Sequence, residues 1–372
     1  MTEAIQINPG GRLDIKDVIG RDREIKRYWG ILQRQGLVIS AERRIGKTHI
    51  VLKMQQECGA DWLVIYQDLE DVHSLAGLVR SIREAFIKHS GGSSFKEKAN
   101  WLTSFLPESI GSIDLGTVGQ DACFALLDKT CASLIEKAGG RKVLLLWDEF
   151  PLMLENIRRR ETEDVVLRLL DSLRALRSTH ASSLRFLFTG SIGLHLVLRN
   201  LHRSGGTNDS VNDMFSLTVP PLTPESTCQL AAGLLRNTQA AAGQIPGLAK
   251  LIAEEVGGFP YHVHHVIDQL AQLPRPPQDT DIARAIDDII SAPADPVHMS
   301  HNNERLFSYY SDQERQLARI MLNALAGQQQ PVSRENLLNL CRHCDTELGD
   351  DRFGEILSIL QKDHYIESLQ SQ

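Results

Sequence analysis

The chain has 372 residues, of which 42% are hydrophobic and 23% are charged, and its formal net charge is −7. This is the composition of a globular protein long enough for two or three domains. The acidic balance provides no general basic field, so charge alone does not favour non-specific binding to nucleic acid.

Two further classes are not expected. Residues 1–20 show no basic segment followed by an apolar one, which argues against a secretory signal. The longest apolar runs fall far short of the roughly 18 residues that a membrane span requires. Six cysteines in a chain of this length do not indicate a disulfide framework. We therefore expect a cytoplasmic protein without a membrane partner.

Short apolar segments alternate with longer amphipathic ones over residues 37–219, which predicts an α/β fold with a parallel sheet. Each predicted strand is a nearly continuous apolar run, as expected when helices cover both faces of a sheet. The predicted strands are Leu37–Ser40, Trp62–Gln67, Lys142–Trp147, Leu184–Thr189 and Phe215–Val219. The predicted helices between them are Lys47–Glu57, Leu75–Lys88, Asp121–Lys137 and Glu161–Ser178. Residues 90–120, rich in Gly and Ser, are predicted to form a loop or a small insertion.

After the proline-rich segment VPPLTPEST the pattern becomes helical, without a convincing strand. The helices predicted there are Glu225–Asn237, Leu248–Val256, Tyr261–Leu273 and Thr280–Ile290. A second break, SAPADPVHMSHNN, precedes three more predicted helices and one predicted strand. These are Asp312–Ala326, Ser333–Cys341, Arg352–Asp363 and the strand Tyr365–Leu369. Three helices followed by a β element are typical of a winged helix-turn-helix.

These breaks predict three domains: a core at 1–222, a helical lid at 223–292 and a winged-helix-like unit at 304–372. The chain ends where the wing strands of such a unit should follow. We therefore expect the third unit to be truncated or to lack its tail.

The first chemical motif follows the strand Leu37–Ser40. A phosphate-binding loop needs curled backbone N–H groups, a lysine for the β- and γ-phosphates and a hydroxyl for Mg²⁺. Gly46, Lys47 and Thr48 supply the last glycine, the lysine and the hydroxyl at the start of a predicted helix, whose N-terminus favours anions. Ala41 stands where the first glycine is expected, at the cost of one methyl group. The alternative is a chance tripeptide.

The second motif is RKVLLLWDEF, an apolar strand that ends in Asp148 and Glu149. A P-loop enzyme needs one carboxylate at a strand end to hold Mg²⁺ and another to orient the attacking water. An acidic pair in solvent after a core strand is the alternative, and the preceding Gly46-Lys47-Thr48 argues against it.

The third motif, SLRFLFTGSIGLH, is a buried strand that ends near Thr189 and Ser191. Some P-loop sheets insert a strand between the first strand and the acid-bearing one. The end of that inserted strand faces the γ-phosphate, where a hydroxyl can hold the water or report the phosphate. A plain turn from strand to loop is the alternative for either residue.

Six segments occur in the order found in AAA+/STAND-type P-loop ATPases: DVIGRDREI, ERRIGKT, VLLLWDEFP, FLFTGSIGL, VPPLTPES and GGFPYHVHHVIDQL. The chain is most similar to the archaeal-ATPase branch, which is related to origin-recognition initiators and to the NACHT and NB-ARC signalling ATPases. The resemblance covers about residues 15–290 and continues more weakly to the end. It is specific to the superfamily and not to one cellular role.

The resemblance implies roles for particular residues. Lys47 would bind the phosphates, Thr48 and Asp148 would hold Mg²⁺, and Glu149 would activate water. Ser191 and Arg199 would assist catalysis, Arg199 as an arginine finger, with Arg203 as its rival. Exposed arginines in solvated ion pairs are the alternative for both. The implied nucleotide-binding residues are Val18, Ile19, Gly20, Arg21, Ala41, Glu42, Arg43, Arg44, Ile45, Gly46, Lys47, Thr48, His49 and Pro260.

The identity of residue 260 helps to decide which branch of the family the chain resembles. Initiator-type relatives carry an arginine in this lid motif to sense the γ-phosphate, whereas this chain has Pro260. That departure favours the STAND-like branch over a true initiator. For Arg43 and Arg44, contact with phosphate, contact with a partner subunit and simple solvation all remain open.

The predicted function is an ATP-binding and ATP-hydrolysing molecular switch with Mg²⁺, which couples the nucleotide state to partner binding or self-assembly. The first alternative is an ATP-dependent DNA-binding initiator or loader that uses the winged helix. From Ser311 onward, six Lys/Arg face ten Asp/Glu, which favours a protein partner over DNA. The second alternative is a scaffold that keeps a nucleotide without hydrolysing it, and the presence of both Asp148 and Glu149 argues against it.

Overall fold

The structure is a computed structural model that describes residues 5–89, 119–191, 193–203 and 210–369. Its contacts divide the chain into a first unit, residues 1–237 and 242–264, and a second unit, residues 238–241 and 265–372. The predicted loop at 90–120 lies almost entirely outside the described residues. The predicted domain boundaries stay predictions. No helix among the described residues is both long and apolar enough to cross a membrane.

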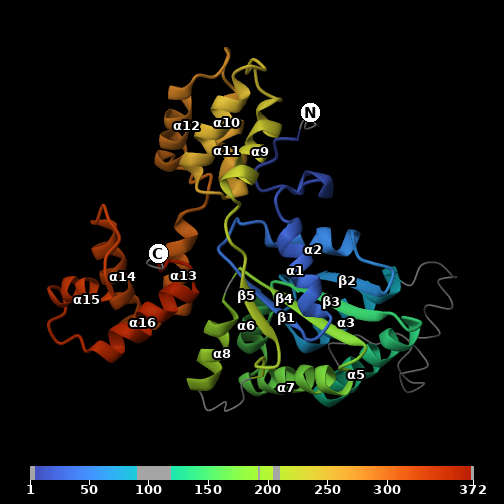
Figure 1. The fold of residues 1–372 in the computed structure, drawn as a ribbon. Helices are drawn as coiled ribbons and strands as arrows, with labels where there is room; N and C mark the ends of the chain where they lie inside the picture. Colours follow the sequence, from blue (N-terminus) through green and yellow to red (C-terminus); the bar gives the residue numbers. More distant parts are fainter. Residues whose placement is uncertain (1–4, 90–118, 192, 204–209, 370–372) are drawn as a thin grey trace. The chain divides into compact units, whose positions relative to one another are not determined.

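The first unit contains a parallel five-stranded sheet, shown in Figure 1. Its strands are β1 (Leu37–Ser40), β2 (Trp62–Asp68), β3 (Lys142–Asp148), β4 (Leu184–Thr189) and β5 (Phe215–Thr218). Their order is β2-β3-β4-β1-β5, and every pair is parallel. The predicted α/β fold and its five strands are confirmed, and β4 lies between β1 and the acid-bearing β3, as the motifs indicate.

Helices cover both faces of this sheet (Figure 1). On one face, α1 and α2 pack against apolar side chains of β1, β2, β3 and β4 in a continuous buried cluster. On the other face, the rings of Trp147, Phe150, Phe186 and Phe188 form an aromatic stack with stacked, tilted and edge-on contacts, their centroids 3.9–5.8 Å apart. The helices of this unit that precede β5 are α1 (Asp22–Leu32), α2 (Lys47–Gln56), α3 (Leu75–His89), α5 (Gln120–Lys137), α6 (Phe150–Arg160), α7 (Glu163–Thr179) and α8 (Leu194–Arg203).

The alternation of side chains along β3 decides which of them lie on the face of the sheet that α2 covers. Leu144 and Leu146 of β3 point into the cluster that contains α2, whereas Trp147 belongs to the aromatic stack on the other face. Since side chains alternate along a strand, Asp148 falls on the same face as Leu146. The last residue of β3 is therefore directed toward the N-terminus of α2.

Two glycines shape the turn that enters α11 (Pro260–Ala271) after α9 (Pro224–Leu235) and α10 (Ile245–Val256). Gly257 and Gly258 have φ of 71° and 84°, a region that favours glycine. The Leu222 N–H donates to the Gly258 carbonyl at 2.8 Å, and a Cβ on Gly258 would lie 2.4 Å from the Leu222 oxygen. The glycines of GGFPY thus let the chain pass close to Leu222 and fix where Pro260 and Tyr261 stand.

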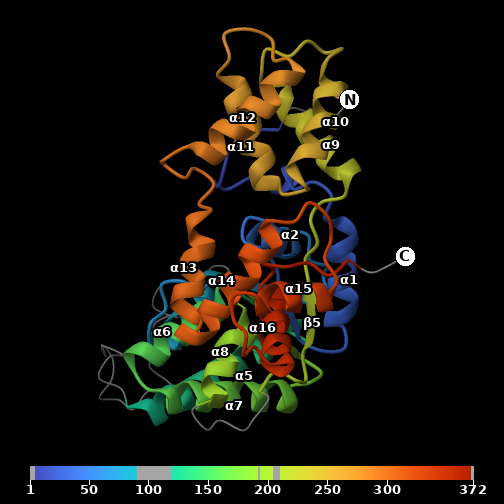
Figure 2. The same cartoon turned by 90° about the vertical axis from the view of Figure 1, so that its left-hand side faces the viewer.

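The second unit is helical, with α12 (Asp279–Ser291), α13 (Ser300–Tyr309), α14 (Asp312–Ala326), α15 (Arg334–Arg342) and α16 (Asp350–Lys362). In Figures 1 and 2, α14 lies against α15 and α16. A capping box of Ser311 and Glu314 starts α14.

The strand predicted at Tyr365–Leu369 is wrong, because this segment has bends and irregular backbone. The Tyr365 N–H donates to the Leu360 carbonyl at 2.9 Å, which closes the end of α16, and its hydroxyl donates to the Asn302 carbonyl at 2.6 Å. The first of these contacts occupies the backbone N–H that a β ladder would need at Tyr365. A wing stays a prediction.

Candidate functional site

The loop between β1 and α2 is wrapped around its own lysine. Lys47 is buried, and its Nζ donates to the carbonyls of Ala41 at 3.0 Å and Glu42 at 2.8 Å. Arg44 and Gly46 have φ of 69° and 93°, so the chain turns through left-handed conformations just before the helix. Backbone N–H groups in such turns, at a helix N-terminus, form a concave site for an anion.

The end of β3 is bound to this loop by a side-chain hydrogen bond. The Thr48 hydroxyl donates to Oδ2 of Asp148 at 2.6 Å, across 100 residues of sequence. The Thr189 hydroxyl from β4 and the Glu149 N–H, at 3.1 Å, both donate to Oδ1. Three donors therefore fix the orientation of a carboxylate that is only 3% exposed.

These oxygens fit the metal that the sequence implies. Mg²⁺ prefers oxygen ligands, and usually binds one or two protein groups together with phosphate and water. Thr48 and Asp148 offer a hydroxyl and a carboxylate oxygen side by side. Among the described residues, no group of three or more His, Cys, Asp or Glu side chains could hold a metal alone. The arrangement suits an ion that a phosphate ligand brings with it.

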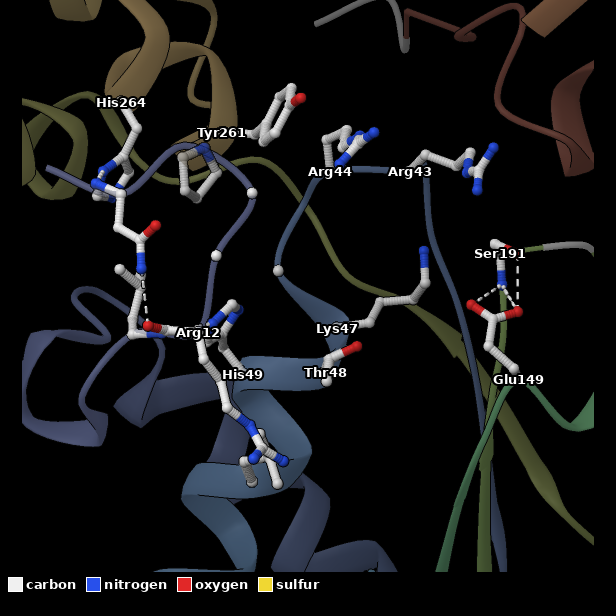
Figure 3. A pocket seen from close by; sticks show the side chains of 17 residues that line it. Arg12, Arg43, Arg44, Lys47, Thr48, His49, Glu149, Ser191, Tyr261 and His264 are labelled. Carbon is white, nitrogen blue, oxygen red and sulfur yellow. Dashed lines mark hydrogen bonds between the residues drawn. The ribbon is translucent and has the colours of Figure 1, made fainter. Parts of the chain in front are cut away.

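Glu149 faces the same space and is held by Ser191. Its carboxylate accepts the Ser191 N–H at 2.9 and 3.1 Å and the Ser191 hydroxyl at 2.7 Å (Figure 3). Glu149 has φ of 56° as it enters α6, an uncommon conformation for a residue with a side chain. Burial raises the pKa of Glu149, and the bonds from Ser191 oppose that shift. Ser191, which the sequence singles out, therefore lies beside Glu149, and its catalytic role stays a prediction.

A pocket of about 370 Å³ lies over the loop (Figure 3). Its walls come from residues within the segments 8–13, 43–52 and 260–264, together with Glu149 and Ser191. Three arginines and Lys47 line it, against Glu149 as the acid. The arginines are Arg12, Arg43 and Arg44. This excess of positive charge suits a polyanion such as a triphosphate.

Three of the residues that the resemblance implies for nucleotide binding lie next to this pocket. Val18, Ile19 and Arg21 line a second cavity of about 40 Å³, which shares Leu13, His49 and other residues with the larger one. Gly20 does not line either cavity; its φ is 72°, and a Cβ there would lie 2.5 Å from Ser226.

Arg21 holds the loop between β1 and α2 through a hydrogen bond to its backbone. Its buried guanidinium donates to the carbonyls of Pro220 at 2.8 Å and Ile45 at 3.1 Å. Burial lowers its pKa. Through its contact with Ile45, Arg21 holds the loop between β1 and α2 in shape.

The structure does not place the predicted arginine finger at the pocket. Arg199 lies on α8 and does not line either cavity, and the Arg203 side chain lies outside the described residues. The arginine finger stays a prediction. Conversely, sequence motifs did not indicate that residues 8–13, Tyr261 and His264 line the pocket. Only the glycine pair at 10–11 hinted at a special turn there.

No known family profile matches the sequence, and no curated protein matches it. Solved structures do. The Walker-type ATPase PABY2304 of Pyrococcus abyssi matches with a TM-score of 0.61 and 14% identity over 97% of this chain and 94% of that one. The chain has the fold of this Walker-type ATPase.

A second structure with this P-loop ATPase fold is the ORC2 protein of Aeropyrum pernix, solved as ADPNP–ADP complexes. It matches with a TM-score of 0.56 and 14% identity, over 93% of this chain and 85% of that one. Identities this low establish the shared fold. The chemistry therefore has to be argued from the residues of this chain.

The role of Arg21 can be tested through stability. We expect Arg21→Met to lower the free energy of unfolding by about 1–3 kcal/mol, because the buried Ile45 carbonyl and the part-buried Pro220 carbonyl lose their donor. Arg23→Met, at an exposed arginine in the first turn of α1, should change it by less than about 0.5 kcal/mol. Urea unfolding followed by tryptophan fluorescence measures both, since all four tryptophans lie within the first 150 residues. Equal stability of the two variants would contradict the supporting role.

Proposed function

We propose that the protein is an ATP-binding and ATP-hydrolysing switch. The observation that supports this most is the Thr48–Asp148 hydrogen bond, which joins the anion-binding loop to the acid-bearing strand. Glu149 and Lys47 line the same pocket. A lysine, a hydroxyl and two carboxylates therefore meet at one edge of a parallel sheet, the arrangement that phosphoryl transfer to water requires.

The loop supplies binding and orientation of the phosphates. The N–H groups before α2 and the Lys47 ammonium group would stabilise the negative charge of the phosphates. Thr48 and Asp148 would hold Mg²⁺, which would neutralise charge on the phosphate oxygens. Thr189, by donating to Asp148, keeps that carboxylate directed toward Thr48.

Glu149 would act on the attacking water. Its carboxylate lies at the wall of the pocket and is held in place by Ser191, so it can accept the proton that the water loses. Burial raises the pKa of Glu149, which makes this carboxylate a stronger base than one in water. Arg199, or an arginine from a partner, would supply further positive charge, and hydrolysis would be slow without it.

The switch would operate through the wall formed by residues 260–264. Pro260 and Tyr261 begin α11 and line the pocket. A ligand in the pocket would fix this first turn, and α11 continues along the chain into the second unit. Nucleotide state would thereby bias the conformation that a protein partner or another copy of the chain recognises.

Binding of DNA is the alternative, because the sequence resembles the archaeal-ATPase branch, which is related to origin-recognition initiators. Residues 311–372 carry six Lys/Arg and ten Asp/Glu, which does not provide the basic surface that DNA recognition needs. We therefore favour a protein partner or self-association.

Nucleotide binding is tested with Lys47→Ala. We expect the affinity for ATP with Mg²⁺ to fall at least about tenfold, because the variant loses a charge at the phosphates. Isothermal titration calorimetry measures this, with Lys250→Ala as the control, since Lys250 is an exposed residue of α10. Binding by Lys47→Ala as tight as that of the wild type would refute the proposed site.

Hydrolysis is tested separately with Glu149→Gln. This variant should keep its affinity for ATP within about threefold and release phosphate about 100-fold more slowly, since a general base commonly contributes that much. A phosphate-release assay under single-turnover conditions gives the rate. If the wild type releases no more phosphate than Glu149→Gln, the protein is a nucleotide-keeping scaffold and not an ATPase.

A further inference from the structure

The N-terminal segment, residues 5–13, is attached at its start to the helical part of the first unit. The Ile5 N–H donates to the Gly233 carbonyl at 3.2 Å, and the Asn237 side chain donates to the Ile5 carbonyl at 2.6 Å. The Ile5 side chain is buried, and a Cβ on Gly233 would lie 2.6 Å from its Cδ1. The absence of a side chain at Gly233 therefore makes room for the segment.

Two histidines from distant elements hold the rest of this segment. The Asn8 N–H donates to Nδ1 of His264 on α11 at 3.2 Å. The Leu13 N–H donates to Nε2 of His49 on α2 at 3.2 Å. A backbone N–H can only donate, so each ring must present the lone pair of that nitrogen. The two imidazoles thus fix the segment at both ends of its path along the pocket.

A tight turn lies between these two attachments. Gly10 has φ of 74°, and a Cβ there would lie 3.2 Å from the Tyr261 ring. Tyr261 in turn stacks under the Arg44 guanidinium, whose Cζ is 4.2 Å from the ring centroid. The segment, the phosphate-binding loop and the first turn of α11 therefore meet at Gly10.

The segment lies at the end of the pocket opposite Glu149. In Figure 3, Lys47 and Thr48 stand between Glu149 with Ser191 on one side and Arg12, His49 and His264 on the other. A triphosphate whose terminal phosphate faces Glu149 would direct its nucleoside toward the segment. The pocket has room there, lined by residues 8–13 together with Tyr261 and His264.

We propose that residues 8–13 form the wall that contacts the nucleoside part of the ligand, and that His264 and His49 are positioning residues that hold this wall. The inference rests on the proposed nucleotide site and adds to it the surface that distinguishes a nucleoside triphosphate from bare polyphosphate. His264 acts through the segment and does not touch phosphate.

The experiment compares two ligands on matched variants. Affinities for ATP and for inorganic tripolyphosphate, both with Mg²⁺, are measured by calorimetry on the full chain. His264→Leu removes the acceptor, His264→Asn offers an amide oxygen near the position of Nδ1, and Gly10→Ala disturbs the turn at a positive φ. Thermal unfolding without ligand shows whether each variant is folded.

We expect His264→Leu and Gly10→Ala to weaken ATP binding about tenfold, and tripolyphosphate binding less than about twofold. His264→Asn should restore most of the ATP affinity. Lys47→Ala should weaken both ligands. Equal loss of both ligands in His264→Leu and Gly10→Ala, or no loss of either, would overturn the inference while leaving the nucleotide site intact. Failure of the wild type to bind ATP would instead overturn the proposed function.

A second measurement uses the wild type alone, so it does not depend on the folding of a variant. Hydrogen exchange of the peptide that contains residues 5–13 should slow on addition of ATP with Mg²⁺ and stay unchanged with saturating tripolyphosphate. Equal protection by both ligands, or by neither, would contradict contact between the segment and the nucleoside.

Discussion

The hydrogen bond from Thr48 to Asp148 is the contact on which the site depends. Two features of the sheet produce this bond, namely the alternation of side chains along β3 and the order of the strands. The alternation of β3 places Asp148 on the face covered by α2, and the insertion of β4 between β1 and β3 brings Thr189 to its other oxygen. A shift of one residue in either strand would turn these groups to the aromatic face. The parallel sheet thus brings together residues 100 positions apart, Thr48 and Asp148, so that their oxygens line one site.

Much of the fold was predictable because buried parallel strands occur in the sequence as short, nearly continuous apolar runs. All five strands were located this way, although β5, at the edge of the sheet, is mostly exposed, and the order of the motifs indicated where β4 inserts. Among the described helices, α1, α6, α8 and α13 were not predicted. The strand at Tyr365–Leu369 was wrong because an apolar alternation has no meaning without a partner strand, and local contacts to Leu360 and Asn302 prevailed.

The site was predictable where local motifs define it and not where distant segments complete it. Lys47, Thr48, Asp148, Glu149 and Ser191 all lie in short motifs with a known layout, and the structure brings them together. The attachment of Asn8 to His264 joins residues 256 positions apart, and no periodicity or spacing encodes such a pair. The N-terminal segment therefore emerged only from the three-dimensional structure, although it supplies one wall of the pocket.

The central claim is that Thr48 and Asp148 share a metal ion with a bound triphosphate. The most direct measurement is the affinity for ATP with Mg²⁺ and with a chelator, in the wild type and in Asp148→Asn. Our account predicts that Mg²⁺ strengthens binding to the wild type by at least about tenfold and strengthens binding to Asp148→Asn much less. The same gain from Mg²⁺ in both proteins, or no gain in the wild type, would contradict it.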